Sequence, residues 1–372
     1  MVEAWHRPTK AIIDLNAIKE NIKLEKKLLK KGQQLFAVVK ANAYGHGLIP
    51  VAMAAQAAGV EGFCVAVIDE GLALRRAGLT KPILILGVNP AELAPLMAAN
   101  HLSVAVDSLE FLKQSERLLH SEHLKLAVHL ALDTGMSRIG FKTTVDLQNA
   151  VNFLRTHPAE FEFQGIFTHF ATADAATDGY YQQQLKKFQQ LLAVVNPLPP
   201  YVHVANSAAS LWHQACGGNM IRFGISMYGL NPSGNVLAMP APFKPALSLI
   251  SQLAAVRVVN AGESVGYGKT YTAQKKEWIG TVPLGYADGW LRRMQGSKVL
   301  VNGKKCEIVG RVCMDQIMVR LPEQLPVGTK VTLIGSEGSL QITAQEVANY
   351  AQTIHYEVLC GISARVPREY ID

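Results

Sequence analysis

Short β-rich runs alternate with longer segments of helical period between about residues 34 and 230, and this alternation constrains the fold more than any other feature. The runs are QLFAVVK (34–40), FCVAV (63–67), PILILG (82–87), LSVAV (102–106), LKLAVHLAL (124–132), FEFQGIFTHF (161–170), YVHVAN (201–206) and NMIRF (219–223). Most are continuously apolar, as strands are when a parallel sheet buries both of their faces. Eight β–α repeats within about 200 residues predict a (β/α)8 barrel, with a doubly wound open sheet as the alternative.

The pattern changes after residue 230. Residues 231–245, NPSGNVLAMPAPFKP, are rich in proline, glycine and small side chains, which is typical of a linker. Strand-like runs dominate beyond it, and glycine turns separate several of them; one helix is predicted near 343–354. We therefore expect two domains, a barrel over residues 1–240 and a mostly β domain over residues 241–372.

Composition excludes several classes of protein. The longest apolar stretches fall well short of the ~20 residues of a membrane span, and the N-terminal MVEAWHRPTK lacks the apolar core of a secretion signal. The net charge is +7, but no basic stripe is interleaved with aromatic residues, which argues against nucleic-acid binding. The five cysteines show neither pairing nor metal-ligand spacing. A cytoplasmic protein with reduced thiols and no metal is expected.

Loops at the C-terminal ends of barrel strands build the active site in barrel enzymes. Applied to the eight runs, that rule selects polar and backbone groups at Lys40, Tyr44, Arg138, His169, Asn206, Ser207, Arg222, Gly224 and Ile225. The loops after the seventh and eighth strands usually hold a phosphate group. The Ser207 hydroxyl and the amides of Gly224 and Ile225 suit that task.

Each of these residues also has an ordinary structural explanation. Lys40 could be solvated, His169 could be a satisfied interior histidine, and Arg222 could belong to a buried ion pair. Ser207 could simply cap a helix. Together, however, a lysine, a phosphate site, an arginine and a histidine at one barrel rim form the set expected for pyridoxal 5'-phosphate. The lysine forms a Schiff base, and its amine must be desolvated to become reactive.

Nine motifs resemble those of the alanine racemase family. They are AVVKANAYGHG, DTGMSRIGF, THFATAD, HVANSAAS, IRFGISMYGL, VGYGKTY, PLGYADGW, GRVCMDQ and GISARVPR. The resemblance as a whole runs from near residue 10 to residue 368. The resemblance implies a pyridoxal-phosphate barrel followed by a β domain. It also implies a head-to-tail homodimer whose two active sites each take residues from both chains, and a small-molecule amino acid as substrate.

The resemblance assigns cofactor contacts. Lys40 would carry the internal aldimine, His169 would sit against the pyridine ring, and Arg222 would face the ring nitrogen. The remaining cofactor-binding positions would be Tyr44, Asn206, Ser207, Gly224, Ile225 and Tyr356, most of them at the phosphate. Because arginine does not release its proton, the ring nitrogen would stay unprotonated, which weakens the electron sink and discourages transamination.

It also assigns substrate contacts. Tyr267 of the partner subunit would be the second catalytic base, opposite Lys40. Arg138 and the backbone of the partner's Met314 would hold the substrate carboxylate, while Tyr286 and Asp315 would narrow the substrate gate. Two bases on opposite faces of a flat cofactor remove and return an α-proton most directly. The implied reaction interconverts L-alanine and D-alanine, supplying D-alanine for peptidoglycan.

Other functions compete with this one. A broad-specificity amino-acid racemase shares most of the motifs. A decarboxylase on a similar barrel places a glutamate where Arg222 stands, and a non-enzymatic pyridoxal-phosphate carrier resembles the barrel alone, without Tyr267. A Schiff-base aldolase normally carries its lysine on a late strand, whereas Lys40 ends the first run.

One position departs from the family pattern. Many members carry a carbamylated lysine seven residues before the carboxylate-binding arginine, and this chain has Ala131 there. Arg138 would then lack its anionic partner. We expect a small anion such as chloride, or ordered water, beside Ala131. We also expect that Ala131→Lys is tolerated and can become carbamylated.

Overall fold

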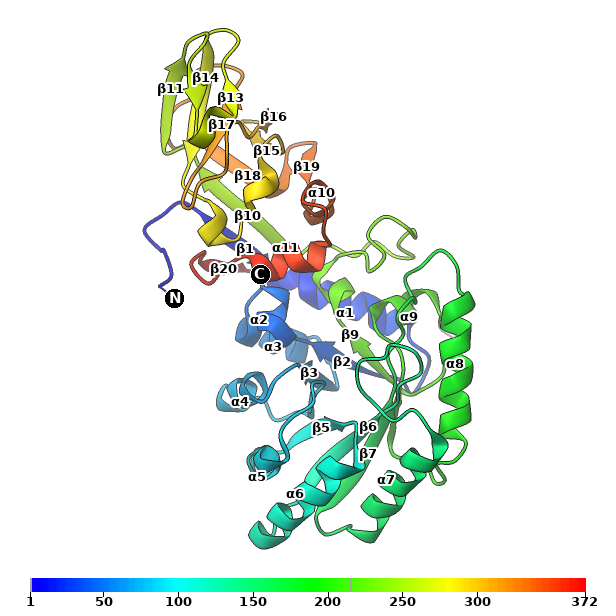
Figure 1. Cartoon of the computed structure of the whole chain (residues 1–372). Helices are drawn as coiled ribbons and strands as arrows, with labels where there is room; N and C mark the ends of the chain where they lie inside the picture. Colours follow the sequence, from blue (N-terminus) through cyan, green and yellow to red (C-terminus); the bar gives the residue numbers. More distant parts are fainter. Residues whose placement is uncertain (1, 214–215) are drawn as a thin grey trace. The chain divides into compact units, whose positions relative to one another are not determined.

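The computed structural model describes residues 2–213 and 216–372, and the chain divides into two compact units. The barrel unit comprises Ala17–Ala43 and Leu48–Lys244. The C-terminal unit comprises the described residues of Met1–Asn16, together with Tyr44–Gly47 and Pro245–Asp372. Figure 1 labels their elements in chain order.

Eight parallel strands form a nearly closed barrel in the barrel unit, in the order β8-β7-β6-β5-β4-β3-β2-β9. They are β2 (Gln34–Val38), β3 (Gly62–Val65), β4 (Ile83–Ile85), β5 (Leu102–Val106), β6 (Leu126–Ala131), β7 (Phe161–Phe167), β8 (Tyr201–His203) and β9 (Met220–Phe223). Backbone bonds from Asn219 N to Val202 O (2.9 Å) and from Arg222 N to Ala205 O (3.0 Å) draw the last two strands together. All eight predicted strands and the barrel are confirmed, and the open-sheet alternative is wrong.

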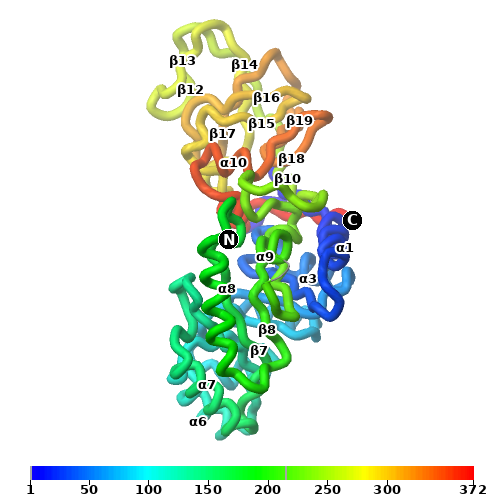
Figure 2. Tube along the Cα trace, turned by 90° about the vertical axis from the view of Figure 1, so that its right-hand side faces the viewer, coloured from blue at the N-terminus to red at the C-terminus, as the bar shows by residue number. Residues whose placement is uncertain are grey.

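Helices lie outside these strands, as Figure 2 shows for α6 to α9 around β7 and β8. They are α1 (Leu15–Leu28), α3 (Leu48–Ala57), α4 (Ile68–Arg76), α5 (Ala94–Ala99), α6 (Leu109–Glu122), α7 (Thr144–Thr156), α8 (Gly179–Leu192) and α9 (Ser207–Trp212). In α6 the buried residues Leu112, Ser115 and Leu119 recur at helical spacing, so one face packs inward. The Ser108 hydroxyl caps this helix by accepting a bond from Phe111 N.

The C-terminal unit is mostly β, as predicted. Its largest sheet has the order β16-β15-β18-β10-β1-β20, with β19 paired to β18, and two smaller sheets are β11-β14-β17 and β12-β13. The strands are β1 (Lys10–Asp14), β10 (Leu247–Gln252), β11 (Ala255–Val259), β12 (Ser264–Val265), β13 (Tyr271–Thr272), β14 (Glu277–Val282), β15 (Lys298–Val301), β16 (Lys304–Glu307), β17 (Ile317–Leu321), β18 (Lys330–Glu337), β19 (Leu340–Ile342) and β20 (Arg368–Ile371). The predicted helix is α10 (Ala344–Tyr350), and a further helix, α11 (His355–Gly361), was not predicted.

Strand β1 joins the start of the chain to its end. It pairs antiparallel with β10, where Ala11 faces Leu249, and parallel with β20, where Ile12 faces Glu369. The alternation in KAIID buries Ala11 and Ile13. Sequence patterning expected the C-terminal domain to follow one cut near residue 240. The compact unit instead also draws on residues before 17 and on Tyr44–Gly47.

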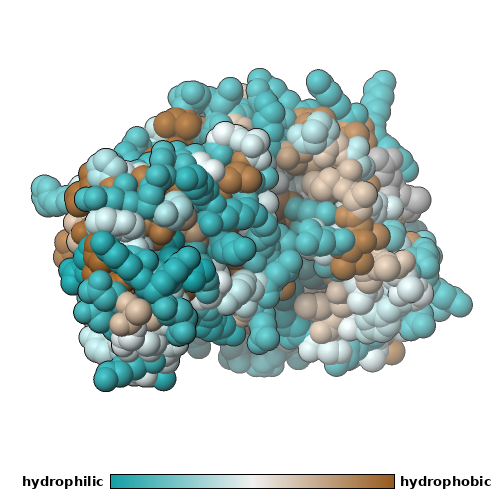
Figure 3. Space-filling model, turned by 90° about the horizontal axis from the view of Figure 1, so that it is seen from above, coloured by the Kyte–Doolittle hydropathy of each residue, from teal (hydrophilic) through white to brown (hydrophobic). Residues whose placement is uncertain are grey.

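The helices and the cysteines bear on the expectations drawn from composition. Among the described residues, no helix combines the length and apolarity needed to span a membrane. Figure 3 shows one face of the molecule, on which hydrophobic side chains form scattered patches among mostly hydrophilic ones. All five cysteines are free thiols, and Cys64, Cys216 and Cys306 are buried.

Candidate active site

The segment after β2 is a left-handed turn that begins at the predicted lysine. Element α2 (Lys40–Tyr44) has φ of 53° at four consecutive non-glycine residues, Ala41, Asn42, Ala43 and Tyr44. Left-handed helical geometry costs an L-residue roughly 1–2 kcal/mol. Such strain persists only where surrounding bonds hold it, and it is typical of functional sites.

Hydrogen bonds within the barrel unit hold this turn. Ala43 N donates to Val39 O (2.8 Å). Ala41 N donates to the carboxylate of Glu70 (2.6 Å), and the Asn42 side chain accepts a bond from Leu48 N (2.8 Å). These bonds restrain the turn at Ala41, Asn42 and Ala43, so the backbone that follows Lys40 has one fixed course.

His169, which follows β7, accepts a bond from Arg222 and is subject to the charges of two further predicted cations. Burial lowers the pKa of His169 to about 3, and the positive charges of Arg222, Arg138 and Lys40 act in the same direction. The imidazole is therefore neutral at physiological pH. Four residues predicted from four different strand ends thus share one electrostatic environment in the barrel unit.

Arg222, on β9, is 3% exposed and held by both terminal nitrogens. Nη1 donates to His203 Nδ1 (2.8 Å), and Nη2 donates to Thr168 O (2.9 Å) and to His169 Nδ1 (3.3 Å). Burial lowers the pKa of Arg222 to about 10, so the guanidinium stays charged at neutral pH. Among the described residues no acceptor meets its Nε–H, which leaves one donor for a ligand.

The predicted phosphate loops also meet. Gly224 N donates to the Ser207 hydroxyl (2.9 Å), which links the start of α9 to the turn η2 (Ile225–Tyr228). The Asn206 side chain accepts a bond from Ala209 N (2.9 Å). Asn206 is therefore the helix cap, and the capping explanation considered for Ser207 is wrong. A phosphate bound here would compete with Ser207 for the Gly224 amide.

Arg138 is exposed in the loop after β6, and no ion pair or hydrogen bond involves it in the described part of the chain. Asp133 shapes this loop by accepting bonds from Gly135 N (3.0 Å) and Ser137 N (2.9 Å). Burial alone would raise the pKa of Asp133, but these amides and Lys142 hold it below its usual range. Sequence analysis missed Asp133, although an Asp-Thr-Gly turn is a recognisable signal.

Ala131, the position that departs from the family, is 2% exposed at the end of β6. It forms an apolar cluster with Ala105 and Phe167, and Ile139 packs against it. The expected anion or water beside Ala131 remains a prediction, and these neighbours contribute no polar side chain to such a site.

Two of the predicted cofactor residues lie in the C-terminal unit. The rings of Tyr44 and Tyr356 have centroids 6.1 Å apart and are tilted by 46°. Gly45, which follows Tyr44, has φ of 84°, and a Cβ there would lie 2.2 Å from the Leu359 carbonyl oxygen. Only glycine permits this approach of the Tyr44 segment to α11.

The remaining predicted residues gather elsewhere in the C-terminal unit. A hollow of about 570 Å³ is lined by Gly266, Tyr267, Cys313, Met314, Asp315, Gln316 and Met318. Tyr267 is 68% exposed and Met314 53% exposed. Tyr286 joins the group because its amide donates to Cys313 O (3.1 Å).

Two arginines fix this group, and neither was predicted. Arg365 pairs with Asp315 (2.5 Å), so that carboxylate has a structural partner. The guanidinium of Arg311 lies against the turn that carries Tyr267, because a Cβ on Gly268 would come within 3.1 Å of it. The only sequence signal for Arg311 was its place in the GRVCMDQ motif.

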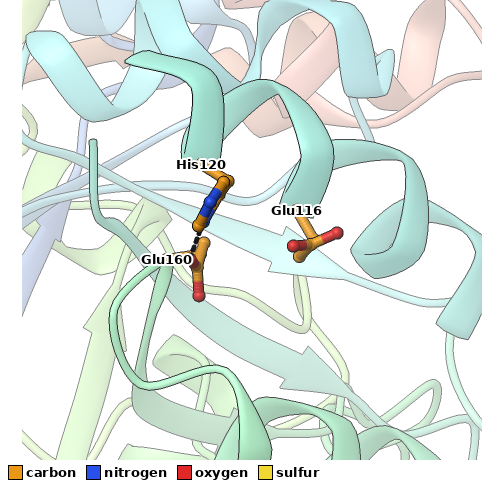
Figure 4. A group of neighbouring side chains, drawn as sticks. All are labelled: Glu116, His120 and Glu160. Carbon is orange, nitrogen blue, oxygen red and sulfur yellow. Dashed lines mark hydrogen bonds and ion pairs between the residues drawn. The ribbon is translucent and has the colours of Figure 1, made fainter. Parts of the chain in front are cut away.

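A separate group of potential ligands lies in the barrel unit, away from the C-terminal strand ends. Glu116 and His120 stand one turn apart on α6, and Glu160 precedes β7 (Figure 4). Their donor atoms lie within 4.8 Å of one another, but His120 Nδ1 and Glu160 Oε1 already pair at 2.7 Å. We interpret the group as an ion pair that ties α6 to the start of β7.

Comparisons with known proteins cover the whole chain. The N-terminal domain family of alanine racemases matches residues 13–232, and the C-terminal domain family matches residues 246–370. The chain belongs to the alanine racemase family. It is 60% identical over 370 residues to alanine racemase of Ligilactobacillus salivarius, with all of both chains covered.

Solved structures agree. The crystal structure of alanine racemase from E. faecalis is 54% identical and superposes with a TM-score of 0.98 over 100% of both chains. Alanine racemase from Bacillus anthracis, solved with bound L-Ala-P, is 43% identical, with a TM-score of 0.95 over 99% of this chain and 96% of that one. The predicted family and activity are confirmed, and alanine racemase is supported over the broad-specificity alternative.

Proposed function

We propose that this racemase binds pyridoxal 5'-phosphate at the C-terminal rim of the barrel and uses Lys40 and a partner's Tyr267 as its two bases. The observation that carries the proposal is the buried Arg222, which donates to a neutral His169 (3.3 Å), while the charges of Arg138 and Lys40 act on the same imidazole. Positive charge beside an uncharged ring suits a ligand with a phosphate, a carboxylate and an aromatic nitrogen.

The residues fit the cofactor. The unclaimed Nε–H of Arg222 is a donor for the pyridine nitrogen, and neutral His169 can flank the ring. Lys40 would bind it covalently. The other residues proposed to hold it are Tyr44, Asn206, Ser207, Gly224, Ile225 and Tyr356. When bound, the cofactor supplies a conjugated electron-withdrawing ring that makes the α-proton of the amino acid acidic.

The chain's own groups then move the proton. Lys40 Nζ removes or returns the α-proton on one face of the substrate, and the phenol oxygen of Tyr267 from a second copy of the chain does so on the opposite face. Arg222 keeps its proton at neutral pH, because its pKa is about 10 even after burial has lowered it. Arg222 would therefore donate to the ring nitrogen of the bound cofactor without protonating it, which would weaken the electron sink and limit side reactions.

We propose a homodimer because Tyr267 is exposed in the single chain, and a catalytic base must be enclosed with its substrate. A second copy of the chain would provide that enclosure. Its phenol lies beside a hollow that Met314 and Asp315 also line. In this arrangement Arg138 and the backbone of the partner's Met314 hold the alanine carboxylate. Tyr286 and Asp315 narrow the access route to small substrates.

We further propose a cytoplasmic enzyme that supplies D-alanine for peptidoglycan. Its five free thiols suit a reducing compartment.

The test is a racemisation assay of the purified chain with added pyridoxal phosphate, combined with borohydride reduction and peptide mass spectrometry. We expect D-alanine from L-alanine and a reduced cofactor adduct on Lys40. Lys40→Ala should lose both, Tyr267→Phe should keep the adduct and lose racemisation, and Lys186→Ala, an exposed lysine of α8, should keep both. An adduct on another lysine, or racemisation by Lys40→Ala, would disprove the assignment.

A further inference from the structure

A chain of hydrogen bonds crosses the barrel interior from Arg222 to β5. Arg222 Nη1 meets His203 Nδ1 (2.8 Å), and His203 Nε2 meets His129 Nδ1 (2.8 Å). His129 Nε2 meets Gln164 Oε1 (3.1 Å), and the Ser103 hydroxyl donates to the same oxygen (2.6 Å). Every member except Gln164 is less than 5% exposed.

The direction of this chain follows from its first member. The guanidinium of Arg222 can only donate, so His203 Nδ1 must accept and its ring proton must sit on Nε2. That proton points to His129 Nδ1, which forces the proton of His129 onto Nε2 as well. The last proton then needs an acceptor, and Gln164 Oε1 supplies it.

The opposite direction is forbidden. If the amide of Gln164 were turned over, its NH2 group would donate to His129 Nε2, and both histidines would carry their protons on Nδ1. His203 Nδ1–H would then face Arg222 Nη1–H at 2.8 Å, donor against donor. Both rings must also be neutral, since burial lowers the pKa of His129 to about 4 and that of His203 well below its usual value.

We propose that Gln164 is a positioning residue for racemisation: its amide oxygen accepts the last proton of the chain that Arg222 directs, stabilises the Nε2–H tautomers of His129 and His203, and so holds Arg222 in place to donate to the cofactor. The function it serves rests on the cofactor role proposed above for Arg222. The tautomers themselves do not depend on that role.

The backbone of β7 supports this assignment independently. Val128 is in register with Phe163, but His129 is in register with Gly165, so Gln164 is the extra residue of a β-bulge. Bulges redirect side chains and are frequent next to active sites. A Cβ on Gly165 would lie 2.1 Å from His129 Nδ1, so the glycine makes room for the imidazole.

Stacking fixes the planes of the two rings. His129 stacks on Tyr201 with centroids 5.7 Å apart at 16°, and His203 stacks on Phe167 with centroids 4.8 Å apart at 9°. Stacking leaves the tautomer of each ring undetermined. The proton positions therefore depend on the two ends of the chain, Arg222 and Gln164.

The experiment compares two variants of similar size in the full-length protein. Gln164→Met removes the acceptor, whereas Gln164→Glu keeps an acceptor oxygen but adds a buried charge. Long-range 1H–15N spectra of histidine-labelled protein report tautomers without cofactor, and single His→Asn variants assign the signals. Steady-state racemisation over pH reports function. Gln183→Met, at an exposed position of α8, is the matched control.

In the parent we expect both histidines as neutral Nε2–H tautomers. Gln164→Met should leave the buried His129 Nε2–H without its acceptor, which should shift or broaden the His129 signal and lower kcat about tenfold, the size of one net hydrogen bond, with little change in KM. Gln164→Glu should keep the Nε2–H tautomers, retain more kcat than the Met variant, and add a titration to the pH profile, because a carboxylate raises the basicity of His129.

Three results would overturn the proposal: an Nδ1–H tautomer at either histidine of the parent, parental kcat and a parental His129 signal in Gln164→Met, or a Met variant more active than the Glu variant. The last order is what simple packing predicts, since a buried charge disturbs packing more than a thioether does. Failure of the parent to racemise alanine with pyridoxal phosphate would instead refute the proposed function and leave the tautomer result standing.

Discussion

The hydroxyl of Tyr228 donates a hydrogen bond to the carbonyl oxygen of Val38, 2.9 Å away. Val38 is the last residue of β2, two residues before Lys40, and Tyr228 ends the turn that begins at Ile225. Both residues are buried. One bond therefore ties the segment proposed to hold the phosphate to the strand end that carries the proposed covalent lysine.

Tyr228→Phe tests this tie. The ring stays in place but the donor is lost, so we expect the free energy of unfolding to fall by about 1 kcal/mol and cofactor affinity to weaken. Urea unfolding and cofactor titration measure the two effects. Tyr350→Phe is the control, because the half-exposed Tyr350 also donates to a backbone carbonyl, that of Gln295 (2.6 Å), within the C-terminal unit and outside the proposed site. Equal losses in both variants would contradict a special role for Tyr228.

A buried carboxyl group makes stability depend on pH. Glu25 on α1 accepts a short hydrogen bond from Ser210 on α9, and burial raises the pKa of Glu25 from 4.5 to about 7. Between these values the folded protein binds more protons than the unfolded chain. Stability is therefore fully present at pH below the unfolded value and falls as the pH rises toward 7.

Glu25→Gln should remove this dependence. The parent should lose roughly 2–3 kcal/mol of unfolding free energy between pH 4.5 and 8 through this group, and the variant should lose much less. Urea midpoints at both pH values provide the measurement, with Glu122→Gln, an exposed carboxyl of α6, as the control. An unchanged pH slope in Glu25→Gln would show that Glu25 is already ionised at low pH.

Gly165→Ala should be costly because the added Cβ would lie 2.1 Å from His129 Nδ1. Overpacking of this kind typically costs about 1–3 kcal/mol, and here it should also displace the His129 ring from Gln164. Gly179→Ala is the matched control, since nothing lies within 4 Å of a Cβ at that first position of α8. We expect the control to be neutral or slightly stabilising. Similar unfolding midpoints for the two variants would refute the close-packing argument.

The barrel was predictable because its strands are buried on both faces and therefore read as continuous apolar runs. Strand β1 was missed because five residues of alternating pattern have no visible partner, and its partners β10 and β20 lie more than 200 residues away. The left-handed turn after Lys40 was equally invisible, since alanine and asparagine carry no obligatory signal for it.

The same physics separates the predicted site residues from the missed ones. Lys40, His169 and Arg222 stand at strand ends, where a fold-level rule locates chemistry. His129 and Gln164 lie within strands, and His203, although it ends β8, lies inside the predicted run 201–206; in such runs a polar residue resembles an interruption of the apolar pattern. Their signal existed only jointly, as polar positions in neighbouring strands that must satisfy one another once buried. The register shift that places Gln164 in a β-bulge could not be predicted from the sequence.

Ala131→Lys tests the position that departs from the family. Ala131 packs against Ala105, Phe167 and Ile139, so a bare ammonium there is poorly solvated, and we expect the variant to fold with a loss of about 1–3 kcal/mol. Bicarbonate should restore part of this loss, because a carbamate converts the amine into an anion that can pair with Arg138.

The readouts for Ala131→Lys are the intact mass and the unfolding midpoint, with and without bicarbonate. We expect the mass of one added carbon dioxide and a higher midpoint. Ala131→Met, of similar length and without an amine, controls for overpacking and should not respond to bicarbonate. A Lys variant with no added mass would mean that the apolar neighbours exclude the reaction, and that Arg138 depends on another anion or on solvent in this chain.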